Sequence, residues 1–186
     1  NVYTAGPANS LSVRVNAFGN ADNPRNLRVK LFQNVVYDAP MPFFSSARVD
    51  LDNLPIALLQ NPAYVPIYVN NNSSVTNDRI VVSYIGITYP ATFNFNNQKN
   101  FYFELAASAS GNYLLIDNVN YGTVAPILYD MTSGSRYIGD IVSTPGKVKF
   151  VLPASSVALR KFRLINQETA NVNIVSSLNQ RNFLNF

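Results

Sequence analysis

The sequence predicts an all-β protein, and three features carry this prediction. Apolar and polar residues alternate in many short segments, which is the pattern of strands with one buried face. No segment keeps a helical period of 3.6 residues over three turns, whereas Tyr and Phe, which favour strands, number 11 and 12. Clusters of Asn, Gly and Pro separate the alternating segments and predict turns.

The alternating segments follow one another along the whole chain. Each places its apolar side chains two residues apart, so that they share one face of a strand. The predicted inward-facing sets are Leu11, Val13, Val15 and Ala17; Leu27, Val29 and Leu31; Val49 and Leu51; Phe101, Phe103 and Leu105; Val148, Phe150 and Leu152; Phe162 and Leu164; and Val172 and Ile174.

One segment differs, because residues 79–89 are almost continuously apolar until Pro90 ends them. Continuous apolar character is typical of a strand that is covered on both faces. We therefore expect Tyr84, Ile85, Ile87 and Tyr89 to lie in a central strand.

We expect a boundary between two domains in segment 106–111, Ala-Ala-Ser-Ala-Ser-Gly, because it consists of small residues. The seven or eight strands before it fit a jelly-roll-like two-sheet sandwich over residues 1–109. The five or six shorter strands after it fit a smaller immunoglobulin-like β-sandwich over residues 110–177. Residues 178–186 are expected to form a junction toward a following domain that is not in this chain.

The chain has no histidine and no cysteine. Histidine is the usual general base and metal ligand, and cysteine is the usual thiolate nucleophile. Their absence excludes Ser-His-Asp and Cys-His catalysis, imidazole or thiolate zinc sites and iron–sulfur clusters within this chain. We therefore expect this chain itself not to be an enzyme.

Ten Asp and Glu residues remain as candidates for oxygen chemistry. Asp50 and Asp52 share one face of a predicted strand, but an independent glycosidase needs a pair held about 5–9.5 Å apart in a cleft. A solvated strand face explains them more simply. The loop from Asn70 to Asp78 is rich in oxygen but holds one carboxylate, where tight calcium sites gather several. No cofactor is expected, and calcium in this loop is kept as an alternative.

Four tyrosines beside predicted turns are the candidate binding-surface residues: Tyr64, Tyr68, Tyr121 and Tyr137. Exposed aromatic rings can stack on sugar rings, so a carbohydrate-binding module of an exported enzyme is an alternative function. Trp is absent, and structural packing of the four rings is the competing explanation.

The formal net charge is +4, and basic residues alternate with apolar ones, as in Arg28-Val29-Lys30-Leu31. This pattern indicates a solvated strand face and not the dense basic stripe of a nucleic-acid-binding protein. No apolar run approaches 18 residues, so no membrane span is expected.

Three segments carry a resemblance to a known family. Residues 78–105 contain Asp-Arg-Ile-Val-Val-Ser-Tyr-Ile-Gly-Ile-Thr-Tyr-Pro, then Phe-Asn-Phe, then Gln-Lys-Asn-Phe-Tyr-Phe-Glu-Leu. Residues 126–134 read Pro-Ile-Leu-Tyr-Asp-Met-Thr-Ser-Gly, and residues 175–186 form the third segment. Together they resemble the β-rich region immediately upstream of the catalytic domain in gingipain-like cysteine peptidases, including the type IX secretion system sortase of Bacteroidetes.

This resemblance implies a non-catalytic accessory segment, placed before a peptidase domain that follows Phe186 on the same polypeptide. The parent protein would be a cysteine peptidase that is secreted, periplasmic or on the cell surface. The catalytic residues of the family belong to that following domain, and no position here matches them. The implied partners are the peptidase domain, secretion-system proteins and substrate proteins.

Overall fold

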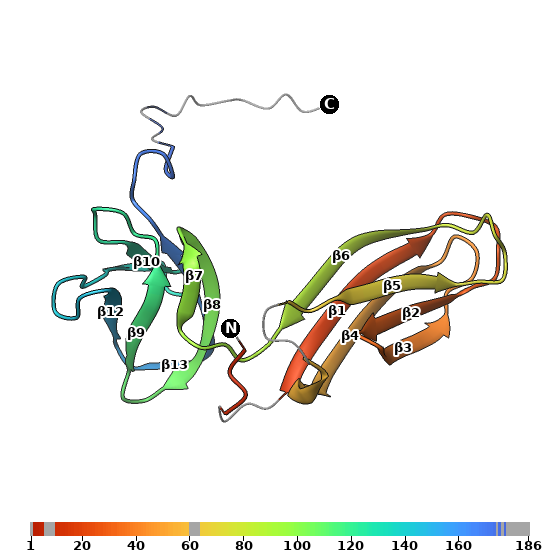
Figure 1. The fold of residues 1–186 in the computed structure, drawn as a ribbon, viewed down its shortest axis with the longest axis horizontal. Helices are drawn as coiled ribbons and strands as arrows, with labels where there is room; N and C mark the ends of the chain where they lie inside the picture. Colours follow the sequence, from red (N-terminus) through yellow and green to blue (C-terminus); the bar gives the residue numbers. More distant parts are fainter. Residues whose placement is uncertain (1, 6–9, 60–63, 174, 176, 178–186) are drawn as a thin grey trace, which may run out of the picture. The chain divides into compact units, whose positions relative to one another are not determined.

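The computed structural model describes residues 2–5, 10–59, 64–173, 175 and 177, and Figure 1 shows its strands. The chain forms two compact units, Asn1–Thr92 and Phe93–Phe186. Over the described residues, regular structure consists of β-strands and one short 3₁₀ helix, η1 (Ile56–Leu58). The predicted all-β class is confirmed.

The first unit is a sandwich of two antiparallel three-stranded sheets, ordered β4-β1-β6 and β3-β2-β5. The bounds of its strands are β1 (Ser10–Gly19), β2 (Asn26–Leu31), β3 (Asn34–Pro40), β4 (Ser46–Pro55), β5 (Ile67–Asn72) and β6 (Ile80–Thr88).

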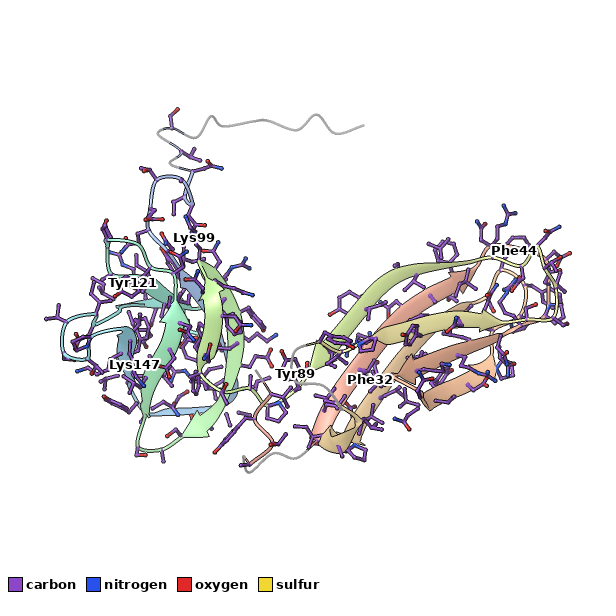
Figure 2. The ribbon with its side chains drawn as sticks, in the orientation of Figure 1. Phe32, Phe44, Tyr89, Lys99, Tyr121 and Lys147 are labelled. Atoms are coloured by element: carbon purple, nitrogen blue, oxygen red, sulfur yellow. The ribbon has the colours of Figure 1, made fainter. Side chains whose placement is uncertain are left out.

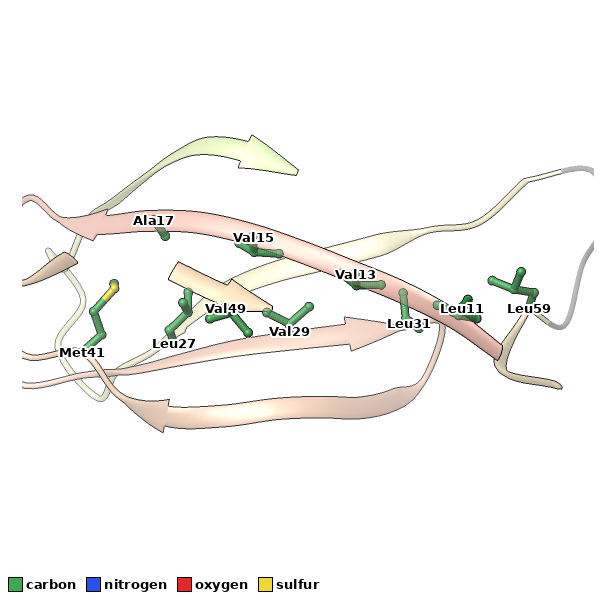
Figure 3. Packing of buried hydrophobic residues seen from close by; sticks show 10 residues of the cluster. All are labelled: Leu11, Val13, Val15, Ala17, Leu27, Val29, Leu31, Met41, Val49 and Leu59. Atoms are coloured by element: carbon green, nitrogen blue, oxygen red, sulfur yellow. The ribbon is translucent and has the colours of Figure 1, made fainter. Parts of the chain in front are cut away.

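The core of the first unit forms between the central strands of its two sheets. β1 contributes Leu11, Val13, Val15 and Ala17, all buried, as their alternation predicts. β2 contributes Leu27, Val29 and Leu31, which are fully buried. Figure 3 shows these two rows of side chains between the sheets, with Val49 and Met41 beside them.

The second unit is also a two-sheet sandwich, with a four-stranded sheet ordered β11-β10-β13-β8 and a three-stranded sheet ordered β12-β9-β7. All strand pairs are antiparallel except β7 with β9. The strand bounds are β7 (Asn94–Gln98), β8 (Asn100–Ser108), β9 (Asn112–Val119), β10 (Ile127–Asp130), β11 (Ser135–Ile138), β12 (Lys147–Leu152) and β13 (Ser155–Ile165).

Aromatic rings fill much of the second core. Phe95 stacks on Phe101 with ring centroids 3.9 Å apart, and Phe103 stacks on Phe162 at 5.4 Å. Because a phenylalanine ring is flat and large, such stacks fill the space between two sheets with few residues. The alternating sets of β8, β12 and β13 all face this core, as predicted.

The boundary between the units lies between Thr92 and Phe93, and not between residues 109 and 110 as expected. Eight strands do precede residue 109, but β7 pairs with β9 and β8 pairs with β13, so both belong to the second unit. Segment 106–111 instead ends β8 and forms its turn into β9, with Gly111 at φ +80°. The expected order of a larger and then a smaller sandwich is therefore not observed.

The prediction that residues 79–89 form a central strand is wrong. β6 lies at the edge of its sheet and β1 occupies the centre. Ile85 is 46% exposed, Tyr84 is similarly exposed, and Tyr89 lies after the end of the strand. The apolar run is continuous because the outward face of β6 also carries uncharged residues, although no second layer of described residues covers that face.

Two expectations concern the C-terminal part of the chain. Val172 lies beyond the end of β13, outside any strand, and is partly exposed. Its expected partner Ile174 and the predicted junction over residues 178–186 lie outside the described residues.

We expect Phe162→Ala to destabilise the second unit by about 3–5 kcal/mol, because it removes a fully buried ring and leaves a cavity. Leu159→Ala is the matched control on the same strand, since Leu159 is 47% exposed. Chemical denaturation should show a loss of less than about 1 kcal/mol for the control. Equal losses for the two variants would contradict the burial pattern of β13.

Candidate functional site

Two of the four predicted tyrosines lie in each unit, Tyr64 and Tyr68 in the first and Tyr121 and Tyr137 in the second. Tyr64 is 63% exposed, with its ring centroid 6.2 Å from that of Phe32. Tyr68 on β5 is 47% exposed, and the Nζ of Lys30 lies 6.0 Å from its ring centre. Tyr121 and Tyr137 instead pack partly against the core of the second unit. Figure 2 labels Phe32 and Tyr121 among the drawn side chains.

Most carboxylates of the chain are bonded to cations. Asp22, Asp52 and Glu104 have no ion pair with a described residue, and Glu104 accepts a hydrogen bond from the Tyr102 hydroxyl at 2.6 Å. The ion pairs join Asp38 to Arg28, Asp50 to Arg14 and Arg48, Asp78 to Arg25, Asp117 to Lys147, Asp130 to Arg160, Asp140 to Lys149, and Glu168 to Lys99. Asp50, one half of the candidate glycosidase pair, is thus held by two arginines.

The carboxylate of the candidate calcium loop is bonded to an arginine. The Asp78 side chain is buried and accepts hydrogen bonds from Arg25 Nη2 at 2.6 Å and Nε at 2.7 Å. Asn71 Nδ2 donates to it at 3.1 Å. The hydrogen bonds from Arg25 hold the pKa of Asp78 at about 2. The loop therefore lacks the free carboxylates that a calcium site needs, and this alternative is not supported.

Arg25 connects three loops of the first unit. Besides Asp78, its guanidinium donates to the carbonyl oxygens of Ala21 at 2.6 Å and Met41 at 3.2 Å, and also to that of Phe43. The loop before β2, the loop after β3 and the loop before β6 thus meet at one charged group.

A second buried pair joins Arg160 on β13 to Asp130 at the end of β10. Arg160 Nη2 and Nε donate to one carboxylate oxygen at 2.9 and 3.1 Å. The other oxygen accepts the backbone N–H groups of Thr132 at 3.0 Å and Ser133 at 3.2 Å. Burial raises the pKa of Asp130, but these hydrogen bonds outweigh it and the pKa is lowered. The Tyr-Asp-Met-Thr-Ser-Gly segment is therefore a turn that an ion pair anchors.

One exposed surface of the second unit is not predicted by the sequence pattern. Four outward residues lie in register on four adjacent strands: Tyr102, Tyr129, Arg136 and Arg163. We call them the Arg–Tyr row. Across the sheet their order is Arg136, Tyr129, Arg163 and Tyr102, and all four are exposed. Because inward and outward residues alternate along each strand, the row lies on the outer face of the four-stranded sheet.

A local sequence pattern does not reveal this row, since its members are 7 to 61 residues apart along the chain. The sequence does indicate that each of the four side chains faces outward, because each alternates with less exposed residues of its own strand. The four side chains become neighbours only through the strand order β11-β10-β13-β8, which the sequence pattern does not give.

Comparisons with known proteins identify no family. No family model matches the chain, and no curated protein matches it. Among solved structures, the chain is similar to the dimeric latent PorU from Porphyromonas gingivalis, with a TM-score of 0.49 and 10% sequence identity. The similarity covers 89% of this chain and 17% of that chain, so this chain spans less than a fifth of that protein. A similarity at this level assigns no function.

We expect Arg160→Leu to cost about 3–5 kcal/mol, because it leaves the buried Asp130 carboxylate without its cation. The exposed Arg163→Leu on the same strand is the control, with an expected change within about 0.5 kcal/mol. Chemical denaturation measures the free energy of unfolding of both variants, and hydrogen exchange shows whether the loss of protection lies in β10 and β13. Adding Asp130→Asn to Arg160→Leu should recover part of the loss, and no recovery would contradict the pairing.

The Arg25–Asp78 pair predicts acid sensitivity of the first unit. Because the pKa of Asp78 is about 2 in the folded chain and the ordinary value is 3.8, its stabilising contribution is present above about pH 4. It is lost as pH falls through 2. Carboxyl chemical shifts in an NMR titration should place the midpoint for Asp78 near pH 2. A midpoint near 4 would show that Arg25 does not hold this carboxylate in solution.

Proposed function

We propose that this chain is a non-catalytic β-sandwich segment of a longer gingipain-like peptidase. It supports the adjacent catalytic domain or binds protein partners. The observation that carries the proposal is that most carboxylates are paired with arginine or lysine, because a cation that lowers the pKa of an acid makes it a poor general acid or base. The chain has no cysteine, so it is not itself a cysteine peptidase.

The sequence resemblance over residues 78–105 and 126–134 supports placing the segment in that family. It also supports a secreted, periplasmic or cell-surface location. Among the described residues, no helix is long and apolar enough to cross a membrane.

A second candidate function is carbohydrate binding by the first unit. The exposed rings of Tyr64 and Tyr68 favour it, since both are available to a flat ligand. The neighbouring Lys30 amine is also available to hydrogen-bond hydroxyl groups of a sugar.

Two assays of the purified chain test the proposal. We expect no turnover of peptide or glycoside substrates, and no specific signal on a glycan array. Turnover that a single carboxylate-to-amide substitution abolishes would contradict the non-catalytic assignment. Glycan binding that Tyr68→Ala abolishes, while Tyr113→Ala on β9 leaves it intact, would favour the second candidate.

A further inference from the structure

We propose that the outer face of the four-stranded sheet is the docking surface for an acidic protein partner. This inference rests on the proposed protein-binding function and names the surface that performs it. The surface consists of the Arg–Tyr row with its exposed neighbours Met131, Ile138 and Lys161, and we call it the docking face.

The row places positive charges and aromatic rings at a regular spacing. Tyr129 on β10 is directly opposite Arg136 on one side and Arg163 on the other. Neighbouring strands are about 4.8 Å apart, so the two arginine backbones are separated by about 10 Å with a tyrosine between them. A partner can therefore place two carboxylates on the guanidinium groups and an apolar side chain on the ring.

The positive charge of the docking face is only partly neutralised within the chain, by Glu104, which lies opposite Lys161. Five cations of the described residues have no ion pair: Lys30, Arg79, Arg136, Lys161 and Arg163. Three of these five lie on this one face. Glu104 accepts a hydrogen bond from the hydroxyl of Tyr102, whose pKa is raised to about 12 by burial and by this carboxylate. Tyr102 therefore stays neutral, and the face as a whole is complementary to an acidic surface.

The apolar residues of the docking face distinguish a protein partner from an acidic polysaccharide. Ile138 is 71% exposed, and Met131 is almost as exposed. Tyr, Arg and Met are enriched at protein–protein interfaces, and Tyr and Arg are frequent among the residues that dominate binding energy. Sulfates and sugar hydroxyls gain nothing from an isoleucine and a methionine, whereas an apolar side chain of a protein does.

Binding to three polymers tests this inference with the intact chain. The probes are a random copolymer of glutamate and tyrosine, polyglutamate and heparin, each measured by isothermal titration calorimetry at fixed salt. Arg136→Glu with Arg163→Glu should weaken copolymer binding at least about tenfold, since both are proposed to lie at the centre of the contact.

The control variant combines Arg79→Glu with Lys147→Glu. It changes the net charge equally, but Arg79 precedes β6 in the first unit and Lys147 lies on β12, in the other sheet of the second unit. We expect this control to retain its affinity for the copolymer within about threefold, because neither residue belongs to the docking face and salt screens charges outside the contact. All substituted residues are exposed or half-exposed, so thermal unfolding should confirm that both variants are folded.

Ile138→Ser separates a protein partner from a general polyanion. We expect it to weaken binding of the copolymer but not of polyglutamate or heparin. If Ile138→Ser has no effect, and heparin binds as tightly and is as sensitive to the arginine substitutions, the face is a polyanion site and the inference is wrong.

Failure of this inference is distinguishable from failure of the proposed function. The docking-face inference alone is wrong if the chain does not bind the copolymer. It is also wrong if neither the double arginine variant nor Ile138→Ser changes copolymer binding. Turnover of substrate, or specific binding on the glycan array, overturns the proposed function whatever the docking face does.

Discussion

An arginine that is shut off from water must have its N–H groups and its charge satisfied by the protein, and each unit is organised around one such residue. Arg25 connects three loops of the first unit through Asp78 and backbone carbonyls. This arrangement leaves no room for a side chain at Gly19, where a Cβ would overlap Arg25 Nη1 and the Phe43 carbonyl oxygen. Arg160 does the same for the turn after β10. Replacing a whole buried pair by apolar residues is often neutral, whereas removing one partner is costly, so each pair fixes the geometry of the loops that it joins.

The low content of charged residues connects the fold to the function. Charged residues are only 13% of the chain, and most acids are already bonded to cations at strand faces and turns. Few charges are left for recognition, which makes a local concentration of free cations meaningful. Among the described residues, three of the five cations without an ion pair, Arg136, Lys161 and Arg163, lie on the outer face of one sheet.

The sequence predicted individual strands far better than their assembly. Alternation located the buried faces of β1, β2, β12 and β13, because a strand with one wet face needs this pattern. It failed for β6, whose outward face carries Val81 and Tyr84 in place of charges. It also failed for the unit boundary, since a soft hairpin turn at Gly111 resembles a linker, whereas the actual connection at Thr92 is short.

The docking face depends on register between strands that are distant in the chain, which single-sequence patterns do not contain. The tyrosine predictions were limited in the same way. Proximity to a turn does not tell whether a ring points to solvent, as for Tyr64, or toward the core, as for Tyr137.

The edge position of β6 has a consequence for the colloidal behaviour of the protein. From Ile80 to Tyr89 there is no charged residue, and in the described part of the chain no strand pairs with the outer edge of β6. Edge strands usually carry lysine or proline that discourages pairing between molecules. Here the net charge of +4 is the main source of repulsion between chains, and it vanishes near the isoelectric point of about 9.4. Because the repulsion between chains is weakest near this pH, we expect the chain to be most prone to self-association in alkaline buffers.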